Sequence, residues 1–209
     1  MTTKISRLYD NFSAAETAAH SLEAAGLDGG DISVVASNAE GWYNKNDKID
    51  HVDIDHDKDR DGVDDRTEGA RTGAGIGGVA GGAVGLATGL GLLAIPGVGP
   101  VVALGWAAAT LAGAVTGGVA GGAVGALVES GVSKDDADVY AEAIRRGGAL
   151  VVARVPDADV GRYKAILDNA AVDVTTRAAA YRQAGWTRFD DTAPPYTADQ
   201  VIKDRASYR

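Results

Sequence analysis

One long stretch of this chain carries no charge, since the 57 residues between Arg71 and Glu129 include no Asp, Glu, Lys or Arg. Within it, glycine recurs at every fourth residue in two series: Gly73, Gly77, Gly81, Gly85 and Gly89, then Gly113, Gly117, Gly121 and Gly125. Residues i and i+4 lie on one face of a helix. Each series therefore predicts a helix with a groove free of side chains, where a second backbone can approach closely.

The two series are separated by Ile95-Pro96-Gly97-Val98-Gly99-Pro100, a sequence typical of a turn. The pattern predicts a glycine-zippered helical hairpin, with helices over about 71–93 and 101–128. We expect the nine glycines to be the helix-packing residues. Because the turn between them is wholly apolar, it suits burial between subunits.

Two environments suit such a hairpin. Exposed in water, it would form an apolar patch larger than the few hundred Å² that soluble monomers usually tolerate. We therefore expect a homo-oligomer with the hairpins as its core, in the cytoplasm, which the lack of cysteine and of a secretory signal pattern allows. The alternative is the inner membrane with the flanking domain facing the cytoplasm, because about 20 apolar residues span a bilayer and small residues pack helices in lipid.

The segments that flank the uncharged stretch alternate between strand and helix patterns. Residues 5–9 and 32–36 are predicted strands on either side of an alanine-rich helix capped by Asn11 or Ser13. A helix from Ser133, a buried strand over 149–155, a helix from Asp157 and a last strand beginning at 172–174 follow. Without the insertion and the Ser133 helix, the order is βαββαβ. We predict an α+β fold, a ferredoxin-like βαββαβ domain with the hairpin inserted between its second and third strands.

These patterns divide the chain into five parts. They are the first half of the ferredoxin-like domain, an acidic linker, the hairpin, the second half of the domain and an aromatic C-terminal tail: 1–37, 38–70, 71–129, 130–180 and 181–209. The tail carries Trp186, Phe189 and Tyr196, and Thr197 with Gln200 predicts a capping box. The tail either packs on its own domain or docks on a neighbouring subunit.

The acidic linker contains a pattern typical of a calcium loop. In the segment from Asp57 to Glu68, oxygen ligands would come from Asp57, Asp59, Asp61, Asp65 and Glu68, with the carbonyl of Val63 and a sharp turn at Gly62. Aspartate also occupies every odd position from 53 to 61, so a solvated acidic linker remains the alternative. The sequence predicts either a calcium site or such a linker.

Other functional classes find little support in the sequence. The net charge of −9 argues against binding to nucleic acid. We find no nucleophile elbow, phosphate-binding loop or paired His-Glu motif, and the glycines follow no strand as a dinucleotide fingerprint requires. We therefore expect a protein that is not an enzyme and identify no catalytic residue, organic cofactor or small-molecule substrate. A metal-ion sensor is a further alternative.

Several segments resemble the YflT-like family of bacterial general-stress and heat-induced proteins. They are the opening residues 7–12, the glycine-rich stretch through 94–100, residues 138–142 with 145–148, and the C-terminal residues 185–190 and 195–197. The resemblance covers most of the chain and implies a stress-linked bacterial protein. It assigns no catalytic residue.

Overall fold

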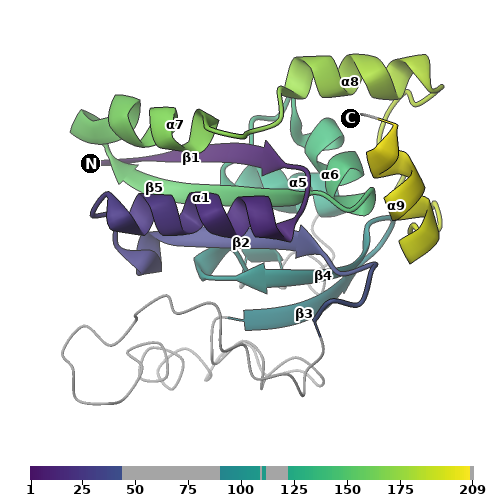
Figure 1. Ribbon diagram of the computed structural model, residues 1–209, viewed down its shortest axis with the longest axis horizontal. Helices are drawn as coiled ribbons and strands as arrows, with labels where there is room; N and C mark the ends of the chain where they lie inside the picture. The colour runs from purple at the N-terminus through teal and green to yellow at the C-terminus, as the bar shows by residue number, and fades with distance from the viewer. Residues whose placement is uncertain (44–89, 109, 112–121, 208–209) are drawn as a thin grey trace.

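The computed structural model describes residues 1–43, 90–108, 110–111 and 122–207. They form a five-stranded antiparallel sheet in the order β1-β5-β2-β4-β3, with helices packed against it (Figure 1). The strands are β1 (Thr2–Tyr9), β2 (Ile32–Ser37), β3 (Leu90–Ile95), β4 (Gly99–Leu104) and β5 (Ala149–Pro156). The helices are α1 (Phe12–Ala24), α5 (Gly122–Ser130), α6 (Ala137–Arg145), α7 (Val160–Asp168), α8 (Val174–Gln183) and α9 (Ala198–Ala206). The predicted α+β class is confirmed.

Helices cover both faces of the sheet, and the sequences of the central strands are apolar as burial on both faces requires. Side chains alternate between the faces of a strand, so β5 supplies Leu150 and Val152 to one hydrophobic cluster and Val151 and Ala153 to the other. The first cluster includes buried residues of α5 and α6, and the second includes those of α1 and α7. Strands buried on both faces read as nearly continuous apolar runs, as β2 and β5 do.

The first part of the fold forms as the sequence predicts. Asn11 caps α1, because its side-chain oxygen accepts a hydrogen bond from the Ala14 N–H at 2.9 Å. The helix stops before Gly26, which lies at φ +93°. β5 pairs with both β1 and β2, and α7 follows β5, so these strands and helices have the arrangement of a split βαβ unit.

The predicted last strand is wrong. Residues 172–174 pass along the outer edge of β1, where the Val172 N–H donates to the Leu8 carbonyl at 2.8 Å. Asp173 then caps a helix instead, accepting a hydrogen bond from the Thr176 N–H at 2.6 Å, and α8 begins at the next residue. A short polar side chain that bonds the backbone ahead of it favours a helix start over a strand.

The ends of the predicted helical hairpin that meet at the turn are also wrong. Residues 90–95 and 99–104 are the paired strands β3 and β4, with Ile95 opposite Gly99. Pro96 and Gly97, the latter at φ +72°, occupy the central positions of a turn closed by a hydrogen bond from the Val98 N–H to the Ile95 carbonyl. This is the geometry of a type II turn. Farther along the predicted second helix, residues 106–108, 110–111 and 122–130 are helical.

The C-terminal tail packs on its own domain, as the first of the two alternatives predicts. Phe189 is buried in the cluster that holds α5 and α6, and Val201 of α9 is fully buried. The predicted capping box of Thr197 and Gln200 begins α9. Within the described ranges, no helix is both long and apolar enough to cross a membrane.

Three glycines allow the tail to lie directly on the backbone beneath it. A Cβ atom on Gly97 would meet the Asp191 Cα at 2.5 Å, and one on Gly99 would meet the Pro195 Cβ at 2.7 Å. A Cβ on Gly147, at the turn between α6 and β5, would overlap a methyl group of Val201. The turn that the sequence suggested for burial between subunits is therefore covered by the chain's own tail.

The contact at Gly147 predicts a measurable loss of stability. In Gly147→Ala the alanine has to adopt a positive φ, and its Cβ atom overlaps Val201. Each effect costs about 1–3 kcal/mol. The matched control is Gly26→Ala, because Gly26 has nearly the same φ, +93° against +96°, and open space where the Cβ would go. We expect urea denaturation to show Gly147→Ala as the less stable by about 1–3 kcal/mol. Equal losses in both variants would contradict close packing of α9 on this turn.

Candidate functional site

The described domain contains one fully buried acidic side chain, Glu142 on the inward face of α6. It lies between two guanidinium groups of the same helix. Arg146 Nε donates to Glu142 Oε1 at 2.6 Å, and Arg145 Nη1 donates to Glu142 Oε2 at 3.2 Å. The sequence spacing brings them together, because residues three and four apart are neighbours on a helix.

Arg146 extends this pair to the tail. Its Nη1 donates to Asp204 Oδ1 of α9 at 2.8 Å. Its guanidinium also lies over the ring of Tyr181 at 4.3 Å and that of Tyr196 at 5.4 Å, while Arg145 lies over Tyr196 at 4.9 Å. Cations attract aromatic faces most strongly where water is excluded. We call Glu142, Arg145, Arg146, Tyr196 and Asp204 the arginine clamp.

The surroundings of Arg146 and Tyr196 shift the pKa of each group. Burial acts to lower the pKa of the Arg146 guanidinium, but the hydrogen bond to Glu142 and the charges of Glu142 and Asp204 outweigh it, so the pKa is raised. Burial raises the pKa of the Tyr196 phenol, although the Arg146 charge opposes it. Arg146 thus stays charged and Tyr196 neutral.

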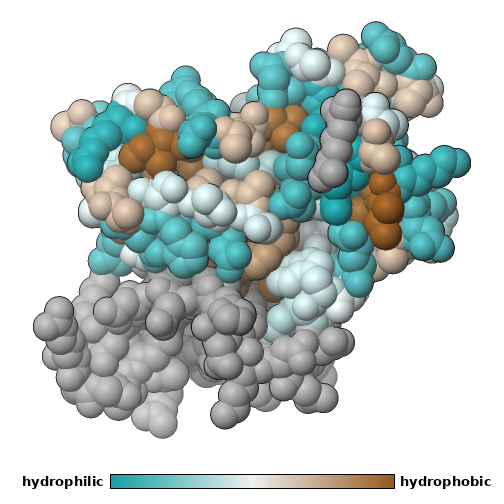
Figure 2. Space-filling model, in the orientation of Figure 1, coloured by the Kyte–Doolittle hydropathy of each residue, from teal (hydrophilic) through white to brown (hydrophobic). Residues whose placement is uncertain are grey.

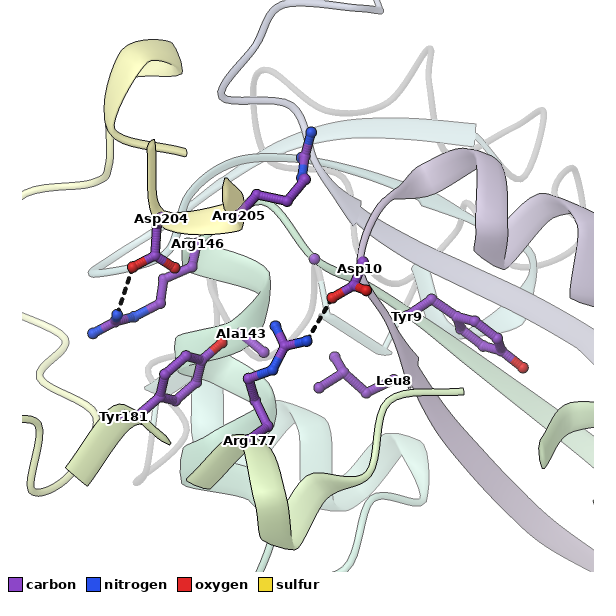
Figure 3. A pocket seen from close by; sticks show the side chains of 10 residues that line it. Leu8, Tyr9, Asp10, Ala143, Arg146, Arg177, Tyr181, Asp204 and Arg205 are labelled. Carbon is purple, nitrogen blue, oxygen red and sulfur yellow. Dashed lines mark hydrogen bonds and ion pairs between the residues drawn. The ribbon is translucent and has the colours of Figure 1, made fainter. Parts of the chain in front are cut away.

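Two further ion pairs surround the clamp. Arg205 of α9 donates to Glu40 at 2.8 Å and to the Gly147 carbonyl at 3.2 Å. Arg177 of α8 donates to Asp10, at the end of β1, at 2.6 Å. Figure 3 shows the pairs Arg146–Asp204 and Arg177–Asp10 on opposite sides of a small cavity. Ion pairs thus join β1, α6, α8 and α9 at one end of the sheet.

The cavity between these pairs limits what the arrangement can do. Its volume is about 10 Å³, and Leu8, Ala143 and Tyr181 also line it. That volume holds about one water molecule. Charged groups that face one another across a space of this size hold segments of the chain together, and a substrate does not fit between them.

The residues predicted from sequence to bind metal or pack helices are only partly placed. Gly125 lies in α5. The other eight zipper glycines lie outside the described residues: Gly73, Gly77, Gly81, Gly85, Gly89, Gly113, Gly117 and Gly121. So do all six predicted calcium ligands: Asp57, Asp59, Asp61, Val63, Asp65 and Glu68. Among the residues that the structure does describe, no cluster of His, Asp or Glu has the arrangement of a metal site.

Sequence reasoning missed the clamp. Arg145 and Arg146 at the end of α6 suit the helix dipole, and this alone would account for two basic residues there. The available signal was Glu142, a single acid within the otherwise apolar run Tyr140-Ala141-Glu142-Ala143-Ile144. A carboxylate on a buried helix face needs partners, and two arginines stand three and four residues later.

Comparisons with known proteins find no similarity that extends this picture. No protein-family model matches the chain, and neither the curated proteins nor the solved structures include a significant match.

The clamp predicts that loss of one buried charge is costly. Glu142→Gln leaves two partly buried guanidiniums with less negative charge, so we expect the free energy of unfolding to fall by about 3 kcal/mol. Asp168→Asn is the control, since Asp168 pairs with Arg7 and its side chain is 51% exposed; an exposed pair contributes at most about 1 kcal/mol. Denaturation of the two variants in urea compares them. If Glu142→Gln is no less stable than Asp168→Asn, Glu142 does not hold the clamp.

Proposed function

We propose that this chain is a non-enzymatic structural protein that assembles with copies of itself through its two glycine series. The sequence observation that carries the proposal is the 57-residue uncharged stretch with glycine at every fourth position. A stress-response role in bacteria is the part of the proposal that rests on the resemblance to the YflT-like family.

The surface of the described domain supports this assignment. Met1, Trp42 and Ile202 are the exposed large hydrophobic residues among those described. Figure 2 shows hydrophobic atoms of the visible face in small separate patches, one of them over α9, the helix that carries Ile202. Patches of this kind are normal on a monomer. In this proposal the apolar surface for assembly comes from the glycine-rich stretch.

The described strands nearest the two series in sequence, β3 and β4, support it as well, because they are paired neighbours in the sheet. The first series ends at Gly89, directly before β3, and the second begins at Gly113, shortly after the helical residues 106–111 that follow β4. Leu90 at the start of β3 is paired with Leu104 at the end of β4. The chain therefore enters β3 and leaves β4 at the same end of this β-hairpin. Two helices that pack through glycine grooves need such a common origin.

The fold proposed for the domain is ferredoxin-like in its core. β1, α1, β2, β5 and α7 supply the βαββα part, and the β3–β4 hairpin extends the sheet beyond β2. The glycine-rich stretch then belongs to an insertion between the second and third core strands. Placement in the cytoplasm is proposed with it, and association with the inner membrane is the competing proposal.

Substitution within the glycine grooves tests the assembly. We expect Gly81→Leu or Gly121→Leu to abolish it, because a leucine in the groove pushes two backbones apart and overpacking costs about 1–3 kcal/mol at each contact. Light scattering measures particle size, and circular dichroism checks that the sheet domain stays folded. Ala179→Leu, at an exposed position of α8, is the control. Particles of wild-type size from both glycine variants would exclude glycine packing as the basis of assembly.

The same preparations separate the two proposed environments. A large particle in detergent-free buffer supports a water-soluble assembly. Protein that pellets with membranes and needs detergent for release supports insertion into the bilayer.

A second proposed function, calcium binding, rests on the ligand spacing from Asp57 to Glu68. Five carboxylates within twelve residues repel one another, and a divalent ion relieves that repulsion. We expect a dissociation constant of roughly 10⁻⁵ to 10⁻³ M, because the loop has no paired partner loop. Calorimetric titration compares the wild type with an Asp57→Asn, Glu68→Gln double variant. Equal heats from the two proteins would mean that the segment only attracts counterions.

A further inference from the structure

A cavity of about 300 Å³ lies at the N-terminal end of α1, between the loop that follows β2 and the helix α9. Its lining comes from four separate parts of the chain, and includes Phe12, Ser13, Trp42, Gly147 and Arg205. This volume is at the lower end of the range for small-molecule sites. It is separate from the one-water cavity beside the arginine clamp, although Arg205 borders both.

One wall of the cavity is a flat aromatic surface. The rings of Phe12 and Trp42 stack with centroids 4.2 Å apart and planes inclined by 20°. The Trp42 Nε1–H donates to the Ser37 carbonyl at 2.7 Å, which fixes the orientation of the indole. Trp42 is nevertheless 37% exposed. A rigid, partly exposed aromatic surface favours a planar ligand that stacks on it or packs against its edge.

The loop that carries Trp42 is held in place before any ligand binds. Asn38 is 7% exposed, and its side chain bonds both the N–H and the carbonyl of Tyr43 at 3.0 Å. The Asn38 N–H in turn donates to the Pro100 carbonyl of β4 at 2.7 Å. A pocket whose walls are fixed in advance loses little entropy when a ligand enters.

The polar groups at the cavity are hydrogen-bond donors in excess. Asn11 accepts from the N–H groups of Ala14 and Ala15, but the N–H groups of Phe12 and Ser13 have no partner among the described residues. Arg205, which also borders the cavity, binds Glu40 and the Gly147 carbonyl through its terminal nitrogens. Glu40 is the one acidic side chain in the lining. Its carboxylate shows what kind of group Arg205 binds.

From these walls and donors we propose that the cavity binds a small planar aromatic carboxylate. Its ring would lie against Phe12 and Trp42. Its carboxylate would accept hydrogen bonds from the free N–H groups of α1 and from Arg205, in competition with Glu40. Arginine binds carboxylates through paired hydrogen bonds, and the exposed Glu40 pair is weak enough to be displaced. The site is independent of the assembly proposed above, so either can fail without the other.

Titration with 2-naphthoate, followed through the indole N–H signals in ¹⁵N NMR, tests the proposal. The chain has three tryptophans, so Trp106 and Trp186 serve as internal controls. We expect the Trp42 signal to shift saturably, with a dissociation constant of roughly 0.1 to 1 mM, and the other two signals to stay in place. No saturable shift, or equal shifts in all three signals, would overturn the proposal.

Three comparisons separate the contribution of the carboxylate from that of the ring. The neutral analogue 2-naphthamide should bind about tenfold more weakly; equal binding would mean an apolar cavity without anion recognition and would overturn the proposed ligand class. Glu40→Gln removes the competing carboxylate and should tighten 2-naphthoate binding by up to about fivefold, whereas unchanged or weaker binding would show that the ligand does not engage Arg205.

A Trp42→Leu variant tests the aromatic wall. In calorimetry it should bind 2-naphthoate about tenfold more weakly than the wild type, and unaltered affinity would exclude the aromatic wall as the ligand contact.

Discussion

The carboxylate of Glu142 has no access to water, and its charge is balanced by the guanidiniums of Arg145 and Arg146. Moving an ion out of water costs several kcal/mol, and the attraction between partners repays this only when geometry and hydrogen bonds are good. Arg146 meets that requirement by reaching a second carboxylate, Asp204, on a helix 58 residues away in sequence. The tail is therefore the part that completes the charge balance of the interior. A buried pair of this kind specifies where segments dock, and adds less to overall stability than its strength suggests.

The position of the tail has consequences at the far edge of the sheet. Between Phe189 and α9, the chain crosses the turn that joins β3 and β4, close enough that Gly97 and Gly99 have no room for a side chain. The first glycine series ends at Gly89, directly before this hairpin in the sequence. A clamp on one side of α6 is thus linked to the β3–β4 turn, through backbone contacts that only glycine permits.

The sequence patterns predicted the elements whose signals are local. α1 has its cap and its stop, and β5 has an apolar run that begins directly after Gly147 and Gly148, so both were placed correctly. The β3–β4 hairpin was misread because the spacing of the glycines was extended beyond the residues that show it. The first series ends at Gly89 and the second begins at Gly113, so residues 90–112 carry no such signal. Val101 and Val102, both β-branched, and the Pro96-Gly97 turn favour a hairpin there.

The clamp could be predicted only in part. Spacing places Glu142, Arg145 and Arg146 on one helix, but nothing local connects them with Asp204 or Tyr196. That contact depends on where the tail docks, and docking follows from packing of Phe189 and Val201 against elements distant in sequence. The position of the tail results from the sum of many weak packing contacts. A pattern of residues along the chain does not contain that information.

Hydrogen exchange in an Asp204→Asn variant tests the central claim most directly, namely that the clamp holds the tail and the tail holds the β3–β4 turn. In the wild type, the Val98 N–H bonds the Ile95 carbonyl and the Asn38 N–H bonds the Pro100 carbonyl. The account predicts faster exchange at these two amides in the variant, and wild-type rates in the paired strands β1 and β5. Exchange that is unchanged at the turn, or raised equally throughout the sheet, would contradict it.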